Sequence, residues 1–157
     1  MAHAEGFTTI VRPVQDVFNF VLDGTNAPLW RPSVMDVTLL PGGHTGVGAT
    51  YKQGLKGPGG KRIDGDYQLT EVKPNEVIKF HVIAGPARPN GTFLFAPHEN
   101  ATKVTFILDF QPKGLAKLMD GMIEKTMHAE IGTLTNLKEY LESPAAQKSS
   151  SKAAAKK

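Results

Sequence analysis

Strand-length segments separated by turn residues fill the middle of this chain, and they constrain its fold more than any other feature. Each segment is rich in β-branched and aromatic residues and is bounded by Gly, Pro or Asn, which favour turns. The segments span residues 34–40, 49–56, 61–73, 76–84, 91–97 and 102–110. Because several of the connections are short, we expect neighbouring segments to pair as antiparallel hairpins.

Alternation within these segments predicts a sheet with one apolar face. It is clearest in the last segment, where Val104, Phe106, Leu108 and Phe110 share one side. The same period of two predicts further sets that share a face: Tyr51, Gln53 and Leu55; Ile63, Tyr67 and Leu69; Phe93 and Phe95. Such a face must be covered by other elements.

The flanking segments supply one more strand and the helices that cover the sheet. Phe7–Arg12 predicts a first strand, and the apolar residues of Val14–Leu22 recur with a helical period before Gly24. Asn26–Pro32 suits one further short helical turn. Leu115–Glu142 predicts a long helix, with one apolar face formed by Met119, Ile123, Met127, Leu134, Leu137 and Leu141. The predicted class is therefore α+β: seven antiparallel strands, two short helices after the first strand, and a long C-terminal helix.

Composition narrows the class of protein. The 157 residues, 40% of them hydrophobic, suit one domain with a real core. The chain has no cysteine, so disulfides and thiolate chemistry are excluded. No stretch approaches the roughly 18 apolar residues of a membrane span, and no secretory signal is recognisable at the N-terminus, so we expect a cytoplasmic protein.

The positive charge is concentrated at the C-terminus. The formal net charge is +3, but Lys148, Lys152, Lys156 and Lys157 follow Ser143 without any acidic residue. The remaining 14 basic and 15 acidic residues nearly cancel. We therefore expect a folded domain over residues 1–142 and a disordered Ser/Ala/Lys-rich basic tail over 143–157. The body carries no basic stripe with interleaved aromatics, so no specific nucleic-acid partner is expected.

Several packing and turn motifs resemble the START-like, or SRPBCC, superfamily, in its polyketide cyclase/dehydrase-like branch. These motifs are Arg12-Pro-Val14 with Val17-Phe18, Trp30-Arg-Pro-Ser-Val34, Gly46-Val-Gly48, Leu69–Phe80, Phe93–Phe95 and Thr102–Phe110. The resemblance covers Phe7 to Glu142. It implies a helix-grip fold, in which the sheet wraps around the C-terminal helix and encloses a cavity for lipids, polyketides or similar molecules.

The residues expected to line such a cavity are apolar or aromatic, with a few polar groups. The ligand-binding candidates are Trp30, Tyr51, Tyr67, Phe93, Phe95, Phe106, Met119, Met127, Glu130 and Leu134. No metal site is expected from the scattered histidines, and no cofactor is expected because the glycine-rich turns match no phosphate-binding or dinucleotide motif.

Glu130 is the most informative polar residue, because it falls inside the apolar face of the long helix. A carboxylate there is costly unless it is paired, protonated or hydrated. It would either orient a ligand and act as an acid or base, or reach water or a basic residue across the sheet.

Three functions stay open: binding of a hydrophobic or aromatic small molecule; a cofactor-free cyclase or dehydratase in which Glu130 and Tyr51 or Tyr67 move protons; and a partner-regulating module whose cavity is filled. Oligomeric state, monomer or dimer, is left open.

Overall fold

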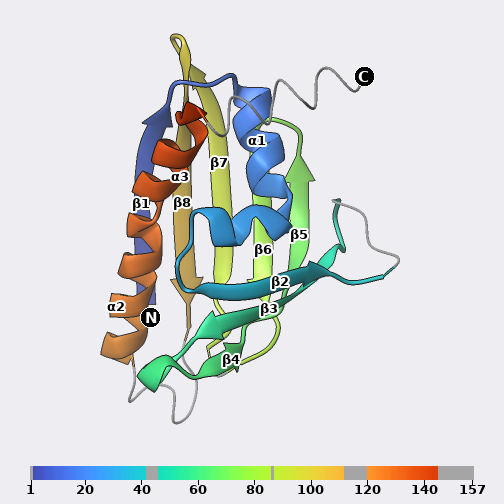
Figure 1. Cartoon of the computed structure of the whole chain (residues 1–157), viewed down its shortest axis with the longest axis vertical. Coiled ribbons are helices and arrows are strands. Elements are labelled where there is room, and N and C mark those ends of the chain that lie inside the picture. Colours follow the sequence, from blue (N-terminus) through green and yellow to red (C-terminus); the bar gives the residue numbers. More distant parts are fainter. Residues whose placement is uncertain (1, 42–45, 86, 112–119, 145–157) are drawn as a thin grey trace.

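The computed structural model describes residues 2–41, 46–85, 87–111 and 120–144 (Figure 1). The predicted basic tail beyond Pro144, like Met119, lies outside the described residues. In chain order the elements are β1 (Ala2–Ile10), α1 (Val14–Leu22), the 3-10 helix η1 (Gly24–Leu29), β2 (Val34–Leu39), β3 (Thr50–Lys56), the 3-10 turn η2 (Pro58–Gly60), β4 (Arg62–Asp64), β5 (Tyr67–Lys73), β6 (Val77–Val82), β7 (Asn90–His98), β8 (Ala101–Phe110), α2 (Asp120–Gly132) and α3 (Leu134–Leu141).

The strands form one antiparallel sheet in the order β1-β8-β7-β6-β5-β3-β2, with the short β4 paired to β3. Helices α1, α2 and α3 lie over the same face, and β2, β3 and β4 curl across its lower end (Figure 1). This arrangement confirms the predicted α+β fold, with its curled antiparallel sheet and C-terminal helix. The two short helices predicted after the first strand are α1 and η1.

Most bounds differ from the predicted ones by one or two residues, and the differences are largest at the first strand, the segment 61–73 and the C-terminal helix. Strand β1 begins at Ala2 rather than Phe7 and pairs with β8 over its whole length. The segment 61–73 is divided into β4 and β5 at Gly65 and Asp66, where Asp66 Oδ1 accepts the N–H of Gln53. The C-terminal helix is interrupted at Thr133, where the Thr133 hydroxyl donates to the Glu130 carbonyl oxygen.

The core lies between the sheet and the helices. Val17 and Phe18 of α1 are buried, and the Phe18 ring meets Phe95 of β7 edge-on with centroids 5.3 Å apart. The rings of Phe93 and Phe106, on neighbouring strands, stack at 4.2 Å. Met127, Leu134, Leu137 and Leu141 bury the face of α2 and α3 that the helical period predicts, which anchors the helices on the sheet.

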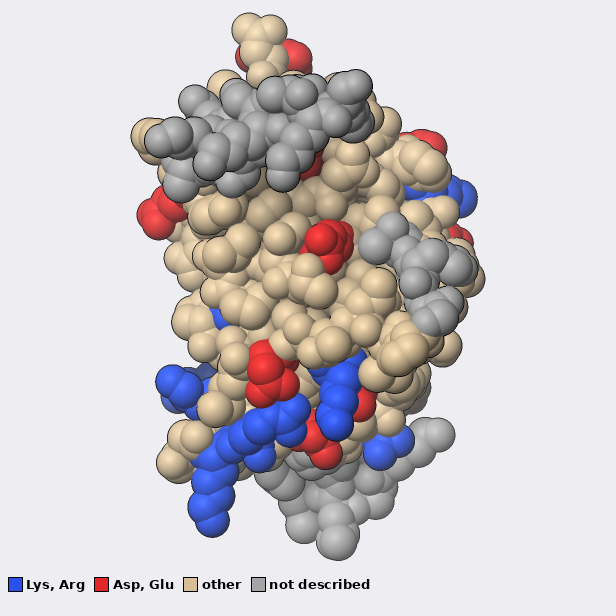
Figure 2. Space-filling model, turned by 45° about the vertical axis from the view of Figure 1, so that its right-hand side comes forward, with Lys and Arg blue, Asp and Glu red and all other residues tan. Residues whose placement is uncertain are grey.

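Charged side chains gather at the lower end of the face shown in Figure 2, whereas the middle of that face carries little charge. At the curled end of the sheet, Arg62 binds Asp36 and Asp64 with N–O distances of 2.9 Å. The Arg62–Asp36 pair links β4 to β2. Because these pairs are exposed, they add little to the free energy of unfolding. Among the described helices, none combines the length and the apolar character that crossing a membrane would require.

The end of α3 is tied to the start of the chain by polar contacts. Glu142 accepts the N–H of Val11 at 2.8 Å and an N–H of Lys138 at 2.8 Å, and Lys138 also donates to the Thr9 carbonyl oxygen. The Lys138 ammonium and the Val11 N–H lower the pKa of the Glu142 carboxyl below its ordinary value. These contacts fasten the C-terminal helix to β1.

Glu142→Gln should therefore lower the free energy of unfolding by about 1 kcal/mol at neutral pH. The lowered pKa means that the carboxylate stabilises the folded state fully above its unfolded pKa, and that this stabilisation is lost as pH falls through the folded pKa. Urea unfolding from pH 7 to pH 3 should show the difference between variant and wild type shrinking at acid pH. A difference that is constant with pH would contradict this role.

Candidate ligand-binding cavity

A cavity of about 480 Å³ lies between the sheet and α2. Its wall on the sheet side comes from β5 to β8 and includes Leu69, Ile78, Phe80 and Leu108. Helix α2 contributes Met122, Ile123, Thr126 and Met127, and the α1–η1 segment and the β3–β4 hairpin close the other sides. The lining is mostly apolar, and the volume is within the range of small-molecule sites in proteins.

Six of the ten sequence-predicted ligand residues line this cavity: Trp30, Tyr67, Phe93, Phe106, Met127 and Glu130. Tyr51, Phe95 and Leu134 are buried but lie outside the lining. Phe95 is held under α1 by Phe18, and Tyr51 is covered by Tyr67. Met119 lies outside the described residues. The part that any of them plays in ligand binding stays a prediction.

Glu130 is paired. Its carboxylate accepts the Arg31 Nε–H at 3.0 Å and the Ser33 hydroxyl, and the side chains of Arg31 and Glu130 are only 15% and 17% exposed. The partner is thus a basic residue from the segment between η1 and β2. Asn136 Nδ2 also donates to the Trp30 carbonyl oxygen, so α2 and α3 are joined to this segment at two points. The pair compensates the carboxylate charge in a wall that is mostly apolar.

Arg31 has hydrogen-bonding capacity to spare. Its Nε–H is engaged by Glu130, but no described residue accepts a hydrogen bond from its two Nη groups. Arg31 lines the cavity, so these donors are available to an oxygen atom of a bound molecule. Sequence reasoning missed this residue, although the Trp30-Arg-Pro motif placed it beside a predicted ligand residue.

The two predicted tyrosines have different surroundings. Their rings stack at 5.0 Å, and the Tyr51 hydroxyl donates to the Leu22 carbonyl oxygen at 3.4 Å. The Tyr67 hydroxyl has no hydrogen-bond partner among the described residues, and it packs against Gly24, where a Cβ would collide with it. Burial raises the pKa of both hydroxyls, and the Arg31 charge opposes that rise at Tyr67. Tyr67 therefore presents a neutral O–H donor at neutral pH.

Sequence reasoning also missed Phe80 and Gln53. The Phe80 ring lies directly over Gly91, where any Cβ would overlap it, so the glycine creates the space for this part of the wall. Gln53 was placed on the inward face of its strand together with Tyr51, but its amide was not recognised as part of a site. Alternation predicts which face of the sheet a side chain lies on. It does not predict whether that side chain lines a cavity.

The fold and cavity define a helix-grip protein, and comparisons with known proteins give the family. Residues 1–142 match the family described as polyketide cyclase/dehydrase and lipid transport, so the chain belongs to this family. No curated protein matches the chain in a sequence search.

Solved structures share the fold at low sequence identity. The Zhui aromatase/cyclase from Streptomyces sp. R1128 is 15% identical, with a TM-score of 0.72 over 91% of this chain and 96% of that one. The protein TTHA0849 from Thermus thermophilus is 18% identical, with a TM-score of 0.72 over 87% and 94% of the two chains. The di-domain ARO/CYC BexL from the BE-7585A biosynthetic pathway is 21% identical, with a TM-score of 0.69 over 92% of this chain and 48% of that one.

Proposed function

We propose that this protein binds a hydrophobic or aromatic small molecule in the cavity between the sheet and α2. The observation that carries the proposal is the cavity of about 480 Å³, walled mainly by aliphatic and aromatic side chains. A partner-regulating module would need this space filled, which makes that alternative the weaker one. Membership of a family whose description includes lipid transport supports the proposal.

The polar groups of the cavity would orient the guest. Arg31 and Tyr67 both have donors that no described residue engages, and both belong to the lining. A guest with a carbonyl or ether oxygen at one end would place that oxygen against these donors and its apolar body against Phe93 and Phe106. Buried apolar area supplies most of the affinity, and the polar contacts supply orientation.

The test is binding of an apolar fluorescent probe, N-phenyl-1-naphthylamine, to wild type and two tryptophan variants of α2. Ile123 lines the cavity, so Ile123→Trp should fill part of it and weaken binding by about tenfold. Ala129 is exposed on the same helix, so Ala129→Trp should bind as wild type does. Equal affinity in all three proteins would place the probe elsewhere and overturn the proposal.

A second candidate function, a cofactor-free cyclase or dehydratase, is favoured by the same two free donors. The Tyr67 O–H and Arg31 would donate hydrogen bonds to a carbonyl oxygen of the substrate and stabilise the negative charge that this oxygen gains as an enolate forms. Glu130 is less suited to move protons, because Arg31 and Ser33 already engage its oxygens. Tyr51 donates to a backbone carbonyl oxygen away from the lining, which makes Tyr67 the better candidate of the two.

A further inference from the structure

A buried amide forms part of the cavity wall. Gln53 belongs to β3 and lines the cavity, and only 3% of its surface is exposed. It lies two residues from Tyr51 on the same face of the strand, which places it next to the stacked tyrosines. Glutamine is rarely buried to this degree unless its polar atoms are satisfied.

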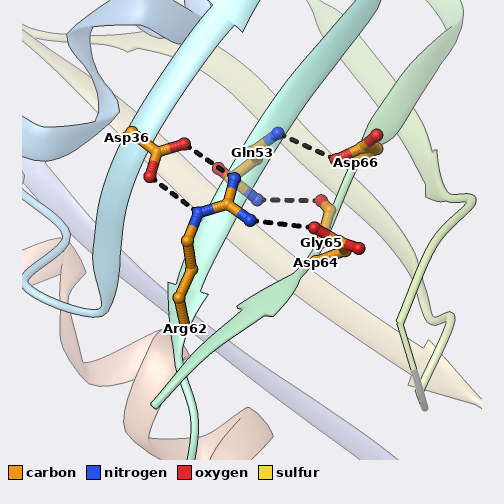
Figure 3. A network of polar contacts seen from close by, with 6 residues as sticks. All are labelled: Asp36, Gln53, Arg62, Asp64, Gly65 and Asp66. Carbon is orange, nitrogen blue, oxygen red and sulfur yellow. Dashed lines mark hydrogen bonds and ion pairs between the residues drawn. The ribbon is translucent and has the colours of Figure 1, made fainter. Parts of the chain in front are cut away.

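The orientation of this amide is determined by its contacts (Figure 3). Nε2 donates to the Gly65 carbonyl oxygen at 3.1 Å, and the backbone N–H of Gln53 donates to Asp66 Oδ1 at 3.0 Å. Exchanging the amide oxygen and nitrogen would set two carbonyl oxygens against each other, so Nε2 must face Gly65. The other end of the amide is then the acceptor Oε1.

The segment that holds the amide is itself fixed. Arg62 of β4 donates to both carboxylate oxygens of Asp36 and to Asp64 (Figure 3). The Gly65 N–H donates to the Gln53 carbonyl oxygen at 2.8 Å. The contacts of Gln53 with Gly65 and Asp66 are therefore made by a segment whose position is fixed by these hydrogen bonds. Gln53 is held in one position rather than free to turn toward solvent.

The oxygen of this fixed amide is unsatisfied. Gln53 Oε1 is buried and has no hydrogen-bond partner among the described residues, and no other described side chain has a fully buried N or O atom in that state. A buried carbonyl oxygen without a donor costs free energy that a bound donor recovers. Gln53 lines the cavity, but its Oε1 has almost no accessible surface, so a donor would bind this oxygen once the side chains that cover it shift aside.

We propose that Gln53 Oε1 is the acceptor of a ligand subsite, and that the guest is an apolar molecule carrying a neutral hydroxyl group that donates to it. This inference rests on the proposed function. An anionic group would be repelled by the carbonyl oxygen, and a cationic amine would lose its hydration in a cavity whose lining is mostly apolar. A neutral O–H avoids both costs.

The experiment compares two probes that differ only in the donor: 2-naphthol, with an O–H, and 2-methoxynaphthalene, its methyl ether. Calorimetric titration of wild type should give a preference for 2-naphthol, and Gln53→Met, which keeps the length of the side chain without its amide, should reduce that preference about tenfold. The two probes also differ in hydrophobicity, so the preference measured in Gln53→Met is the baseline with which the wild-type preference is compared. Leu55→Met, on the next inward position of the same strand, should keep the wild-type preference.

A second measurement uses wild type alone, in case Gln53→Met does not fold. The side-chain carbonyl ¹³C signal of Gln53 should move downfield with 2-naphthol and stay in place with 2-methoxynaphthalene. Two results would overturn the subsite and leave the proposed function standing. One is the same preference between the probes in wild type and Gln53→Met; the other is binding of both probes to wild type without that signal change. Binding of neither probe to wild type would overturn both.

Discussion

Arg31→Met should lower the free energy of unfolding by about 3 kcal/mol at neutral pH, measured by urea denaturation. The substitution leaves the Glu130 carboxylate, whose side chain is 17% exposed, without its cationic partner inside an apolar wall. Removing one member of a buried pair costs several kcal/mol because the other charge is then uncompensated. Ser33 still donates to Glu130, which limits the loss.

The matched control is Arg62→Met. Arg62 makes more ion-pair contacts than Arg31, with Asp36 and Asp64, but its side chain is 37% exposed and its partners are more exposed still. Solvent screens such pairs, so Arg62→Met should unfold close to wild type. The double variant Arg31→Met/Glu130→Met should recover most of the stability lost in Arg31→Met, because no unpaired charge is left. Equal losses at Arg31 and Arg62 would mean that burial of the Glu130 pair has no energetic consequence.

The strands could be predicted from sequence where alternation is carried by large side chains. In β8, Val104, Phe106 and Leu108 are all buried, as their period of two predicts. The start of β1 could not be found in this way. Its inward residues Ala2 and Ala4 are buried, but alanine does not distinguish a strand from other structure. Small residues suit this place because α2 packs closely on β1, with Ile131 directly over Gly6.

The candidate site was predictable as a set of faces but not as a set of contacts. Helical periodicity placed Glu130 on the packed face, yet Arg31 lies 99 residues earlier in the chain, and no local pattern links the two. Alternation turned both tyrosines inward. Which of them has a free hydroxyl depends on the Leu22 carbonyl oxygen, which is near Tyr51 only because α1 ends there. Pairings of this kind are set by tertiary structure.

Gln53 is a residue whose pattern could be noticed in the sequence although its contacts could not be predicted. A polar residue between Tyr51 and Leu55 on an inward face conflicts with a simple apolar pattern, and such conflicts between local pattern and fold are expected at functional or strained positions. The sequence contains the conflict. The cavity, the Gly65 contact and the unsatisfied oxygen appear only when β3, β4 and β5 are assembled.

Phe106→Ala should give the largest loss of stability, about 4 kcal/mol. The Phe106 side chain is 1% exposed, stacks on Phe93 and lines the cavity. Truncating a buried phenylalanine removes its transfer free energy and adds the cost of new empty space. The neighbouring space is already empty, so few atoms can move in to compensate. Denaturant unfolding monitored by circular dichroism should show a lower midpoint with an unchanged m-value.

Phe7→Ala is the control for the same substitution on the outer face of the sheet. Phe7 is 65% exposed, and the Lys103 ammonium lies 4.5 Å from its ring centroid. An exposed cation–π contact is worth at most about 1 kcal/mol, so the variant should unfold close to wild type. A loss at Phe106 no larger than the loss at Phe7 would mean that the Phe106 side chain is not packed against the cavity wall. The ring stack with Phe93 could then not form the rigid surface against which an aromatic guest is proposed to lie.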